Sequence, residues 1–276
     1  MIKWGIVGLG NMAHKFANSI KETDNSQLVG IASLNKTRLK SFKEDYQITE
    51  ENTHYTYDDL IKSKNIDAIY IATLNNTHLE IIKKCAENKK NILCEKPFCL
   101  NLYEAKELHK IILTNKVMFF EAIAYLSHPQ TNNIFDLINN NEIGEVISIE
   151  STFGFRIRKI NPESRLFNKE LGGGAILDVG CYPMSFISLF LKNNNKIVFN
   201  DVVGEICHTD VDIAASANLT VNEKIKCKIK ISFKEYFKNN SIIKGTKGSM
   251  IVGFPWVPEK KIFLEIYNKS RYYKSF

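Results

Sequence analysis

Residues 2–13 read IKWGIVGLGNMA, a short apolar run followed by two closely spaced glycines. The run up to Gly8 predicts a buried β-strand, because an apolar run without alternation is typical of a strand covered on both faces. After the glycines, apolar side chains recur at helical spacing, namely at Ala13, Phe16, Ala17 and Ile20. The stretch therefore predicts a strand, a tight turn and a helix, in that order.

The turn has the spacing of a dinucleotide-binding site. Gly8, Gly10 and Ala13 fit the G-x-G-x-x-G/A pattern. Gly8 permits the sharp bend, Gly10 lets the backbone approach a pyrophosphate, and Ala13 keeps the helix close to the strand. The N–H groups at the helix N-terminus, which includes Asn11 and Met12, would face the phosphates. Flavoproteins and some methyltransferases share related turns, but the strand–turn–helix order at the N-terminus favours a nicotinamide dinucleotide here.

The end of the second predicted strand, residues 28–33, bears on the choice between NAD and NADP. An NAD site usually has Asp or Glu at this place to bind the ribose hydroxyls. This chain has no acid there, and Ser33, Lys36 and Arg38 could instead bind a 2′-phosphate. The alternative is that Lys36 and Arg38 are solvated residues at the start of a helix. We expect NADP(H) to be preferred over NAD(H).

The periodicity of the chain changes near its middle. In the first part, short apolar runs alternate with helical patterns, which predicts a doubly wound parallel sheet. Two of the helices begin with capping-box spacing, Thr77 with Glu80 and Asn101 with Glu104. We assign residues 1–119 to a Rossmann domain.

The second part of the chain has a period of two. Residues 147–157, 211–221 and 225–233 alternate apolar and polar side chains, as strands with one buried face do. Four lysines share one face of the last run, and they would either bind an acidic partner or simply be solvated: Lys224, Lys226, Lys228 and Lys230. We assign residues 120–276 to an α+β domain with a mostly antiparallel, open sheet, which makes the whole an α/β protein.

Composition narrows the class of protein. Among the 276 residues no apolar run approaches the ~20 that a membrane span needs, so we expect no membrane association. The N-terminus enters a strand pattern at once, which predicts no signal peptide and a cytoplasmic location. The net charge of +7 would suit a phosphorylated cofactor or an anionic substrate, or it follows from a lysine-rich composition. The sequence has no basic cluster interleaved with aromatic residues, so we expect no nucleic-acid binding. The six cysteines lack the spacing of a zinc site, so we expect no metal.

Two further motifs carry the expected chemistry. Glu95-Lys96-Pro97 follows a predicted strand, and residues 172–183 read GGGAILDVGCYP. Nicotinamide performs hydride transfer, so the protein must supply a group that gives or takes a proton. A free tyrosine has a pKa of about 10, and a nearby ammonium lowers it by stabilising the tyrosinate. Lys96 is the candidate for that cation and Tyr182 for the acid/base.

Two charged residues lie near the second motif. Asp178 precedes Tyr182 by four residues, so on an α-helix the two would share a face. Asp178 would then bind a substrate hydroxyl or orient its neighbours, and Pro183 would kink the helix. Arg165 would contact the cofactor or the substrate, or else be solvated.

Together these motifs resemble the glucose–fructose oxidoreductase, inositol dehydrogenase and rhizopine-catabolism (Gfo/Idh/MocA) superfamily of oxidoreductases. Residues 72–78, ATLNNTH, are similar to its turn after the fourth strand, and residues 120–130 to its domain junction. The resemblance extends from residue 2 to about residue 254. It implies the same roles for the lysine and the tyrosine, and it places further residues at the cofactor: Thr73, Asn75, His78, Glu95 and Lys96.

The resemblance also implies a reaction and an assembly. The tyrosine at position 182 looks most like the ketosugar-reductase and dihydrodiol-dehydrogenase branches. The expected reaction is hydride transfer between NADP(H) and a secondary alcohol or ketone of a sugar or nucleotide-linked sugar. A trans-dihydrodiol or an aldose is the alternative substrate, and a non-catalytic NADP-sensing regulator is the alternative of another class. The resemblance implies a homo-oligomer, a dimer or tetramer, and relatives continue further at the C-terminus, so this chain is a compact variant or a partner chain supplies that cover.

Overall fold

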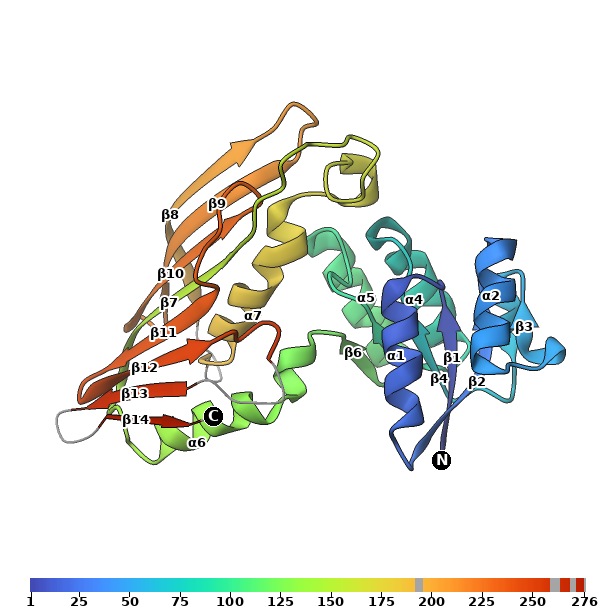
Figure 1. The fold of residues 1–276 in the computed structure, drawn as a ribbon, viewed down its shortest axis with the longest axis horizontal. Coiled ribbons are helices and arrows are strands. Elements are labelled where there is room, and N and C mark those ends of the chain that lie inside the picture. Colours follow the sequence, from blue (N-terminus) through green and yellow to red (C-terminus); the bar gives the residue numbers. More distant parts are fainter. Residues whose placement is uncertain (192–195, 259–263, 269–271, 276) are drawn as a thin grey trace. The chain divides into compact units, whose positions relative to one another are not determined.

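The computed structural model describes residues 1–191, 196–258, 264–268 and 272–275. The chain forms two compact units, Met1–Ala122 and Ile123–Phe276. Each unit has a β-sheet and an apolar core of its own (Figure 1).

The N-terminal unit contains a six-stranded sheet in the order β3-β2-β1-β4-β5-β6, and all neighbouring strands are parallel. Its strands are β1 (Ile2–Val7), β2 (Ser26–Ala32), β3 (Thr53–His54), β4 (Ala68–Ile71), β5 (Asn91–Cys94) and β6 (Phe119–Glu121). The strand order reverses at β1, and doubly wound sheets bind ligands at the carboxyl end of the strands beside such a reversal. The predicted doubly wound parallel sheet is confirmed.

Helices cover both faces of this sheet. They are α1 (Asn11–Lys21), α2 (Lys36–Tyr46), α3 (Tyr57–Lys62), α4 (His78–Glu87) and α5 (Leu102–Asn115), with the short 3-10 turns η1 (Glu50–Asn52) and η2 (Asn75–Thr77). Successive strand residues point to opposite faces. Ile6 and Ile31 therefore pack with the apolar sides of α1 and α2, whereas Val7 and Ala32 pack with those of α3, α4 and α5.

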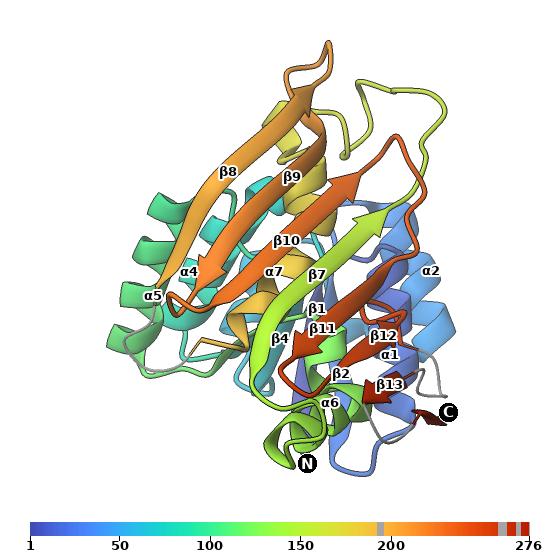
Figure 2. The same ribbon diagram turned by 90° about the vertical axis from the view of Figure 1, so that its left-hand side faces the viewer.

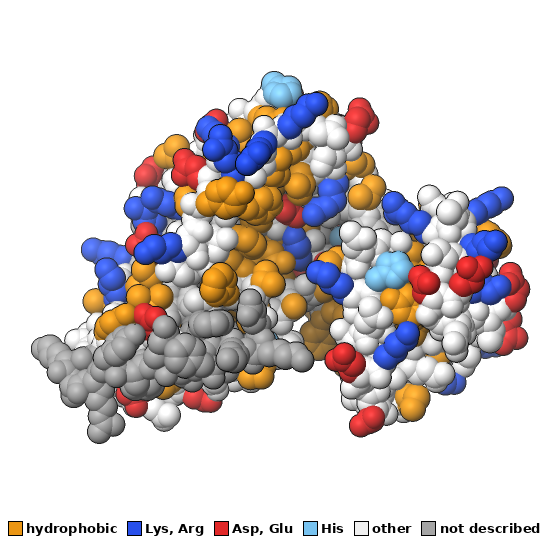
Figure 3. Space-filling model, in the orientation of Figure 1, with side chains coloured by type: hydrophobic (Ala, Val, Ile, Leu, Met, Phe, Trp, Pro, Cys, Tyr) orange, Lys and Arg blue, Asp and Glu red, His pale blue; other side chains and the backbone are white. Residues whose placement is uncertain are grey.

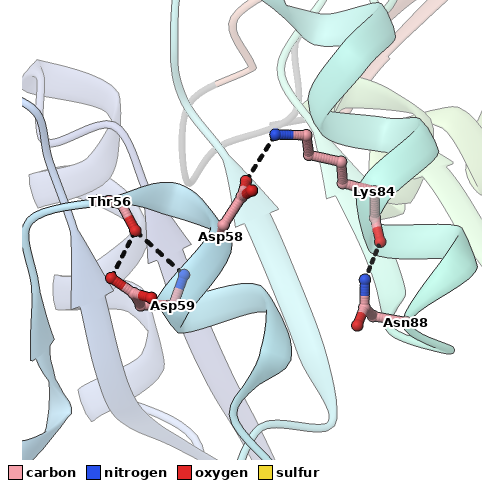
Figure 4. Close-up of polar contacts among 5 residues, drawn as sticks. All are labelled: Thr56, Asp58, Asp59, Lys84 and Asn88. Carbon is pink, nitrogen blue, oxygen red and sulfur yellow. Dashed lines mark hydrogen bonds and ion pairs between the residues drawn. The ribbon is translucent and has the colours of Figure 1, made fainter.

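The ends of α3 and α4 show how side chains fix the helices of this unit (Figure 4). The Thr56 hydroxyl caps α3 by accepting the N–H of Asp59 at 3.2 Å. Lys84 of α4 pairs with Asp58 of α3 at 2.7 Å, and the Asn88 amide donates to the Lys84 carbonyl at 2.8 Å. The Thr56 and Asn88 contacts satisfy backbone groups near the helix ends, and the ion pair joins the two helices.

One of the two predicted caps is confirmed and the other is wrong. The Asn101 side chain accepts the N–H of Glu104 at 3.0 Å and so caps α5. Thr77 instead ends η2 with a near-helical backbone (φ −100°, ψ −10°), and its hydroxyl donates to Thr73 Oγ1 at 2.7 Å. A capping residue needs an extended backbone to reach the N–H groups ahead of it. Thr77 therefore makes no capping bond, and Glu80 pairs with Lys83.

The C-terminal unit contains an eight-stranded sheet in the order β14-β13-β12-β11-β7-β10-β9-β8. Its strands are β7 (Val146–Gly154), β8 (Ile197–Ile206), β9 (Asp212–Val221), β10 (Ile225–Ser232), β11 (Asn240–Gly245), β12 (Gly248–Gly253), β13 (Leu264–Asn268) and β14 (Tyr272–Ser275). All pairs are antiparallel except β7 with β10, which is parallel. The expected mostly antiparallel sheet is confirmed.

One face of this sheet packs against helices, and Figure 2 views the sheet from the opposite face. The helical elements are η3 (Ala124–Ser127), α6 (Pro129–Asn139), η4 (Lys169–Leu171), a π-helix (Ile176–Gly180) and α7 (Cys181–Ser188). Figure 3 shows apolar side chains gathered over α7 and the strands beside it. The predicted strand 147–157 is too long, because β7 ends at Gly154, where a side chain would overlap Phe237.

None of the helices in the described ranges is long and apolar enough to cross a membrane.

Candidate active site

The predicted site residues divide between the two units. The dinucleotide residues and Lys96 belong to the N-terminal unit, and Arg165, Asp178 and Tyr182 belong to the C-terminal unit. In the N-terminal unit, the turns after β1, β2, β4 and β5 carry them, at the carboxyl ends of four parallel strands. This is the edge at which a doubly wound sheet binds its ligand.

The turn after β1 leaves room for a phosphate group. Gly8 has a φ of 86°, and a Cβ there would lie 2.7 Å from Thr73 Cγ2, so only glycine fits. A Cβ on Gly10 would meet no atom within 4 Å, so the backbone surface at this residue is open. Asn11 and Met12 begin α1, which has no side-chain cap and no acid in its first turn. Its N–H groups and the positive end of its dipole are thus suited to an anion, and the turn fits a pyrophosphate.

The turn after β2 concentrates positive charge. The buried Ser33 hydroxyl accepts the N–H of Asn35 at 3.1 Å, and Asn35 caps α2 by accepting the N–H of Arg38 at 3.0 Å. Lys36 and Arg38 are exposed in the first turn of α2, which contains no acid. Cations are unfavourable at the positive end of a helix dipole. Two of them at this place are therefore suited to an anionic ligand.

Lys96 lies in a turn after β5 that buried groups hold in place. The Tyr70 hydroxyl donates to the Glu95 carboxylate, and Glu121 accepts the N–H of Phe98 at 3.1 Å. Burial raises the pKa of Glu121, and the Phe98 N–H and the positive charge of Lys96 oppose that change. Burial and the neighbouring Glu95 raise the pKa of Tyr70. The two acids thus fix the backbone on either side of Lys96.

His78 links two of these turns. It is fully buried, and its Nδ1 lies 2.9 Å from the Pro97 carbonyl oxygen, while its Nε2 lies 3.4 Å from that of Thr73. Burial lowers the pKa of His78, which favours the neutral ring. A neutral ring donates one hydrogen bond, and the shorter distance assigns it to Pro97. Since both ring nitrogens face backbone carbonyls, His78 holds the turns after β4 and β5. Asn75, in the turn after β4, is also buried.

In the C-terminal unit, Arg165 and Asp178 form an ion pair. Arg165 Nη1 donates to Asp178 Oδ1 at 3.0 Å. Asp178 is only 8% exposed, whereas the Arg165 side chain is about half exposed. The sequence assigned Arg165 and Asp178 to the substrate separately. In the structure they form one ion pair, in which the arginine orients the carboxylate.

The glycine run makes this pair possible. Gly174 donates its N–H to the Leu166 carbonyl at 2.9 Å, and Gly173 donates to that of Asn168 at 3.0 Å. A Cβ on Gly173 would lie within 3 Å of both carbonyl oxygens. Glycine here therefore lets the segment that carries Arg165 lie directly against the start of the helix.

Tyr182 has its ring in an aromatic cluster. The ring centroid lies 5.3 Å from that of Phe153 in an edge-to-face arrangement and 6.3 Å from those of Tyr125 and Trp256. Trp256 is itself held, because its Nε1 donates to the Thr152 carbonyl at 2.9 Å. Such contacts favour the observed orientation of the ring. Sequence reasoning missed Phe153, Tyr125 and Trp256, since no motif or spacing connects them with Tyr182.

The helix that carries Asp178 and Tyr182 differs from the predicted one. Residues 176–180 form a π-helix, which continues into α7 at Cys181. A π-helix bonds residues five apart, so Asp178 and Tyr182 lie on either side of a change of hydrogen-bond register. Pro183 lies in the first turn of α7, directly after this change of helix type. π-Helical turns are rare and are frequently found at functional sites.

A groove of about 340 Å³ lies on the polar side of the C-terminal sheet, away from the predicted residues. Its lining includes Glu150, Asn218, Lys226, Lys228 and Lys244. None of the residues predicted for catalysis or for the cofactor lines it. Of the four lysines predicted to share one face of a strand, Lys226 and Lys228 line this groove.

A parallel sheet with an open glycine turn, followed by a unit with a mixed sheet, defines the class of two-domain dinucleotide-binding oxidoreductases. The oxidoreductase family with an NAD-binding Rossmann fold, GFO/IDH/MocA, matches residues 2–123, and the GFO/IDH/MocA C-terminal domain matches residues 132–251. The chain belongs to the GFO/IDH/MocA family of oxidoreductases. The resemblance inferred from the motifs is confirmed.

Individual relatives agree with this assignment. The chain is 31% identical to a trans-1,2-dihydrobenzene-1,2-diol dehydrogenase of Xenopus tropicalis, over 93% of this chain and 77% of the relative. It is 25% identical to a dTDP-3,4-didehydro-2,6-dideoxy-alpha-D-glucose 3-reductase of Actinomadura kijaniata, over 93% and 76%. These two relatives are named as a dehydrogenase of a diol and a reductase of a nucleotide-linked sugar, and this chain is an oxidoreductase of the same family.

Solved structures share the fold. A 3-ketoreductase from Actinomadura kijaniata, in complex with NADP and TDP-benzene, superimposes with a TM-score of 0.87 at 22% identity, covering 99% of this chain and 83% of that one. An aldose-aldose oxidoreductase from Caulobacter crescentus, complexed with glycerol, does so with a TM-score of 0.89 at 19% identity, covering 100% and 83%.

Proposed function

We propose that this protein is an NADP(H)-dependent oxidoreductase that transfers hydride between nicotinamide and a secondary alcohol or ketone of a sugar or nucleotide-linked sugar. The observation that carries the proposal is the environment of Tyr182. Its ring is fixed by Phe153 and Trp256, and it follows a π-helix that carries Asp178 paired with Arg165. Such a set of groups can hold a polyhydroxylated substrate and exchange a proton with it.

The protein residues have separate roles in this proposal. A bound nicotinamide supplies or accepts the hydride. Tyr182 donates a proton to the ketone oxygen during reduction and takes it from the alcohol during oxidation. Lys96 favours the tyrosinate form by its positive charge. Asp178, oriented by Arg165, accepts a hydrogen bond from a substrate hydroxyl.

The dinucleotide is held by the four turns of the N-terminal unit. The N-terminus of α1, with Gly10, binds the pyrophosphate. Further contacts come from the turns after β4 and β5, where we place Thr73, Asn75, His78, Glu95 and Lys96. His78 acts by holding these two turns, since its ring nitrogens face the carbonyls of Pro97 and Thr73.

Ser33, Lys36 and Arg38 should make NADPH the preferred cofactor. A ligand at a hundredfold over its Kd adds about 2.7 kcal/mol to stability, so NADPH should raise the melting temperature more than NADH does at equal concentration. Arg38→Ala removes a charge-assisted contact worth about 1.5–3 kcal/mol and should weaken NADPH binding roughly tenfold or more. NADH binding should be nearly unchanged.

Lys40→Ala is the matched control, because Lys40 is also exposed on α2 but lies beyond its first turn. Calorimetric titration of both cofactors into the three proteins measures the difference. A wild type that binds NADH as tightly as NADPH would show that the turn after β2 does not select the phosphate.

The substrate is tested by following NADPH at 340 nm with a panel of ketosugars, including nucleotide-linked ones. In the reverse direction, NADP⁺ is offered with a trans-dihydrodiol and with free aldoses. The identity to the Xenopus dihydrodiol dehydrogenase favours the dihydrodiol as second candidate. Turnover of the dihydrodiol alone would replace the sugar in the proposal, and NADPH binding without turnover of any compound would favour a regulator.

We infer further that the protein is a homo-oligomer in the cytoplasm. Edge strand β8 exposes large apolar residues, namely Val198, Phe199, Val202, Val203 and Ile206. A patch of this kind on a soluble protein usually marks an interaction site. Sedimentation velocity should show a dimer or tetramer that Val203→Lys weakens. Cell fractionation tests the location.

A further inference from the structure

Asp212, at the start of β9, lies against the first turn of the helix that carries Asp178 and Tyr182. Its Oδ2 accepts the N–H of Ile176 at 2.7 Å. The helix itself offers no cap, because the residue before Ala175 is Gly174. Asp212 of β9 therefore provides the acceptor that a capping side chain of the helix itself normally provides.

Gly174 is shaped for this contact. Its φ is 118°, and a Cβ on it would lie 2.3 Å from Asp212 Oδ1. A residue with a side chain at this place would displace the carboxylate. The third glycine of the GGG run thus serves the approach of Asp212, whereas Gly173 serves the approach of the segment that carries Arg165.

The Asp212 carboxylate is partly buried beside the N-terminus of the helix. Burial, the largest influence, raises the pKa of Asp212, and the N–H groups of Ile176, Asp212 and Ala175 oppose it. The N-terminus of a helix attracts an anion through its dipole. The contact therefore has the geometry of a hydrogen-bonded cap, with the carboxylate at the positive end of the helix dipole.

The π-helix makes the position of its first turn important. Residues 176–180 hold a hydrogen-bond register that is rare in proteins, so the surrounding structure must favour it over the α-helical register. The aromatic cluster around Tyr182 holds the far end. If the near end were released, the segment could relax to α-helical register, which would rotate Asp178 relative to Tyr182.

We propose that Asp212 is a positioning residue of the active site, whose carboxylate anchors the first turn of this helix and so sets Asp178 relative to Tyr182. The proposal rests on the proposed function, since it concerns the same two side chains. Asp212 contacts neither substrate nor cofactor in this scheme. Its effect on the reaction passes through the helix alone.

Two substitutions of Asp212 test the proposal, one that removes every acceptor and one that keeps an acceptor. Asp212→Ala removes every acceptor and should lower kcat ten- to a hundredfold, as a small misplacement of reacting groups does. The KM for NADPH should stay the same, because the cofactor turns belong to the other unit. Asp212→Asn keeps one oxygen for the Ile176 N–H and should restore kcat to within about threefold of wild type. Asp210→Asn, an equivalent change at an exposed turn residue, is the control.

Hydrogen–deuterium exchange of residues 174–182 gives a readout that needs no substrate. Exchange there should be faster in Asp212→Ala, and close to wild type in Asp212→Asn and in the control. Unchanged exchange in Asp212→Ala, or a wild-type kcat in that variant, overturns the proposal. So does a rise in the KM for NADPH that accompanies the fall in kcat, because that indicates an effect on cofactor binding and not on this helix alone. A wild type without any turnover defeats the proposed function, and the exchange rates then still decide whether Asp212 holds the helix.

Discussion

Tyr182→Phe should lower kcat by a factor of about 10²–10⁴, the usual contribution of a positioned acid or base. The ring and its contacts with Phe153 and Trp256 remain, so the fold and the cofactor turns should be unaffected. NADPH binding by calorimetry should therefore match wild type. Only the hydroxyl that exchanges the proton is lost.

Tyr125→Phe is the matched control for this variant. It removes a hydroxyl from the same aromatic cluster, where Tyr125 contacts Ser185 Oγ at 2.8 Å. We assign that hydroxyl no part in the reaction, so kcat should change no more than a few-fold. Equal losses in the two variants would show that packing in the cluster, and not proton transfer by Tyr182, limits the rate.

Lys96→Met should have the second large effect, a loss of about 10²–10³ in kcat/KM near neutral pH. Methionine keeps much of the side-chain length but removes the charge that, in the proposed mechanism, favours the tyrosinate. In the oxidation direction Tyr182 must be deprotonated to act as a base, so the rate rises with pH. Without the cation the tyrosinate forms at higher pH, and the rising limb of the profile should move to higher pH by one unit or more.

The profile of kcat/KM against pH with NADP⁺ and an alcohol substrate measures this shift. Lys106→Met, at an exposed position of α5, controls for the loss of one positive charge. A Lys96→Met variant that lost activity with an unmoved profile would indicate that Lys96 binds cofactor or substrate without influencing the tyrosine.

The N-terminal unit was largely predictable because its signals are local. The glycine turn at Gly8 and Gly10 and the buried strands follow from residue type over a few positions. The Asn101 cap is likewise local and is confirmed. The predicted cap at Thr77 failed because its hydroxyl bonds to Thr73 and gives the chain a 3-10 turn before the helix.

In the C-terminal unit, local sequence patterns predict the buried faces of strands but not how the strands pair. The alternation in residues 211–221 and 225–233 correctly predicts one buried face, because strand side chains point to alternating faces. It does not reveal that β7 pairs parallel with β10, since no local pattern records which distant strand lies alongside. The π-helix was also missed, as the spacing of Asp178 and Tyr182 fits an ordinary helix.

The sequence by itself determined the class of fold, the dinucleotide turn and the two motifs that contain Lys96 and Tyr182. These depend on residue types within one turn or one strand, over which spacing dictates geometry. Only the tertiary structure decided what surrounds Asp178 and Tyr182, namely the ion pair with Arg165, the cap from Asp212 and the ring of Trp256. Those contacts join segments far apart in the chain, and they form only when strands and loops of the folded unit bring them together.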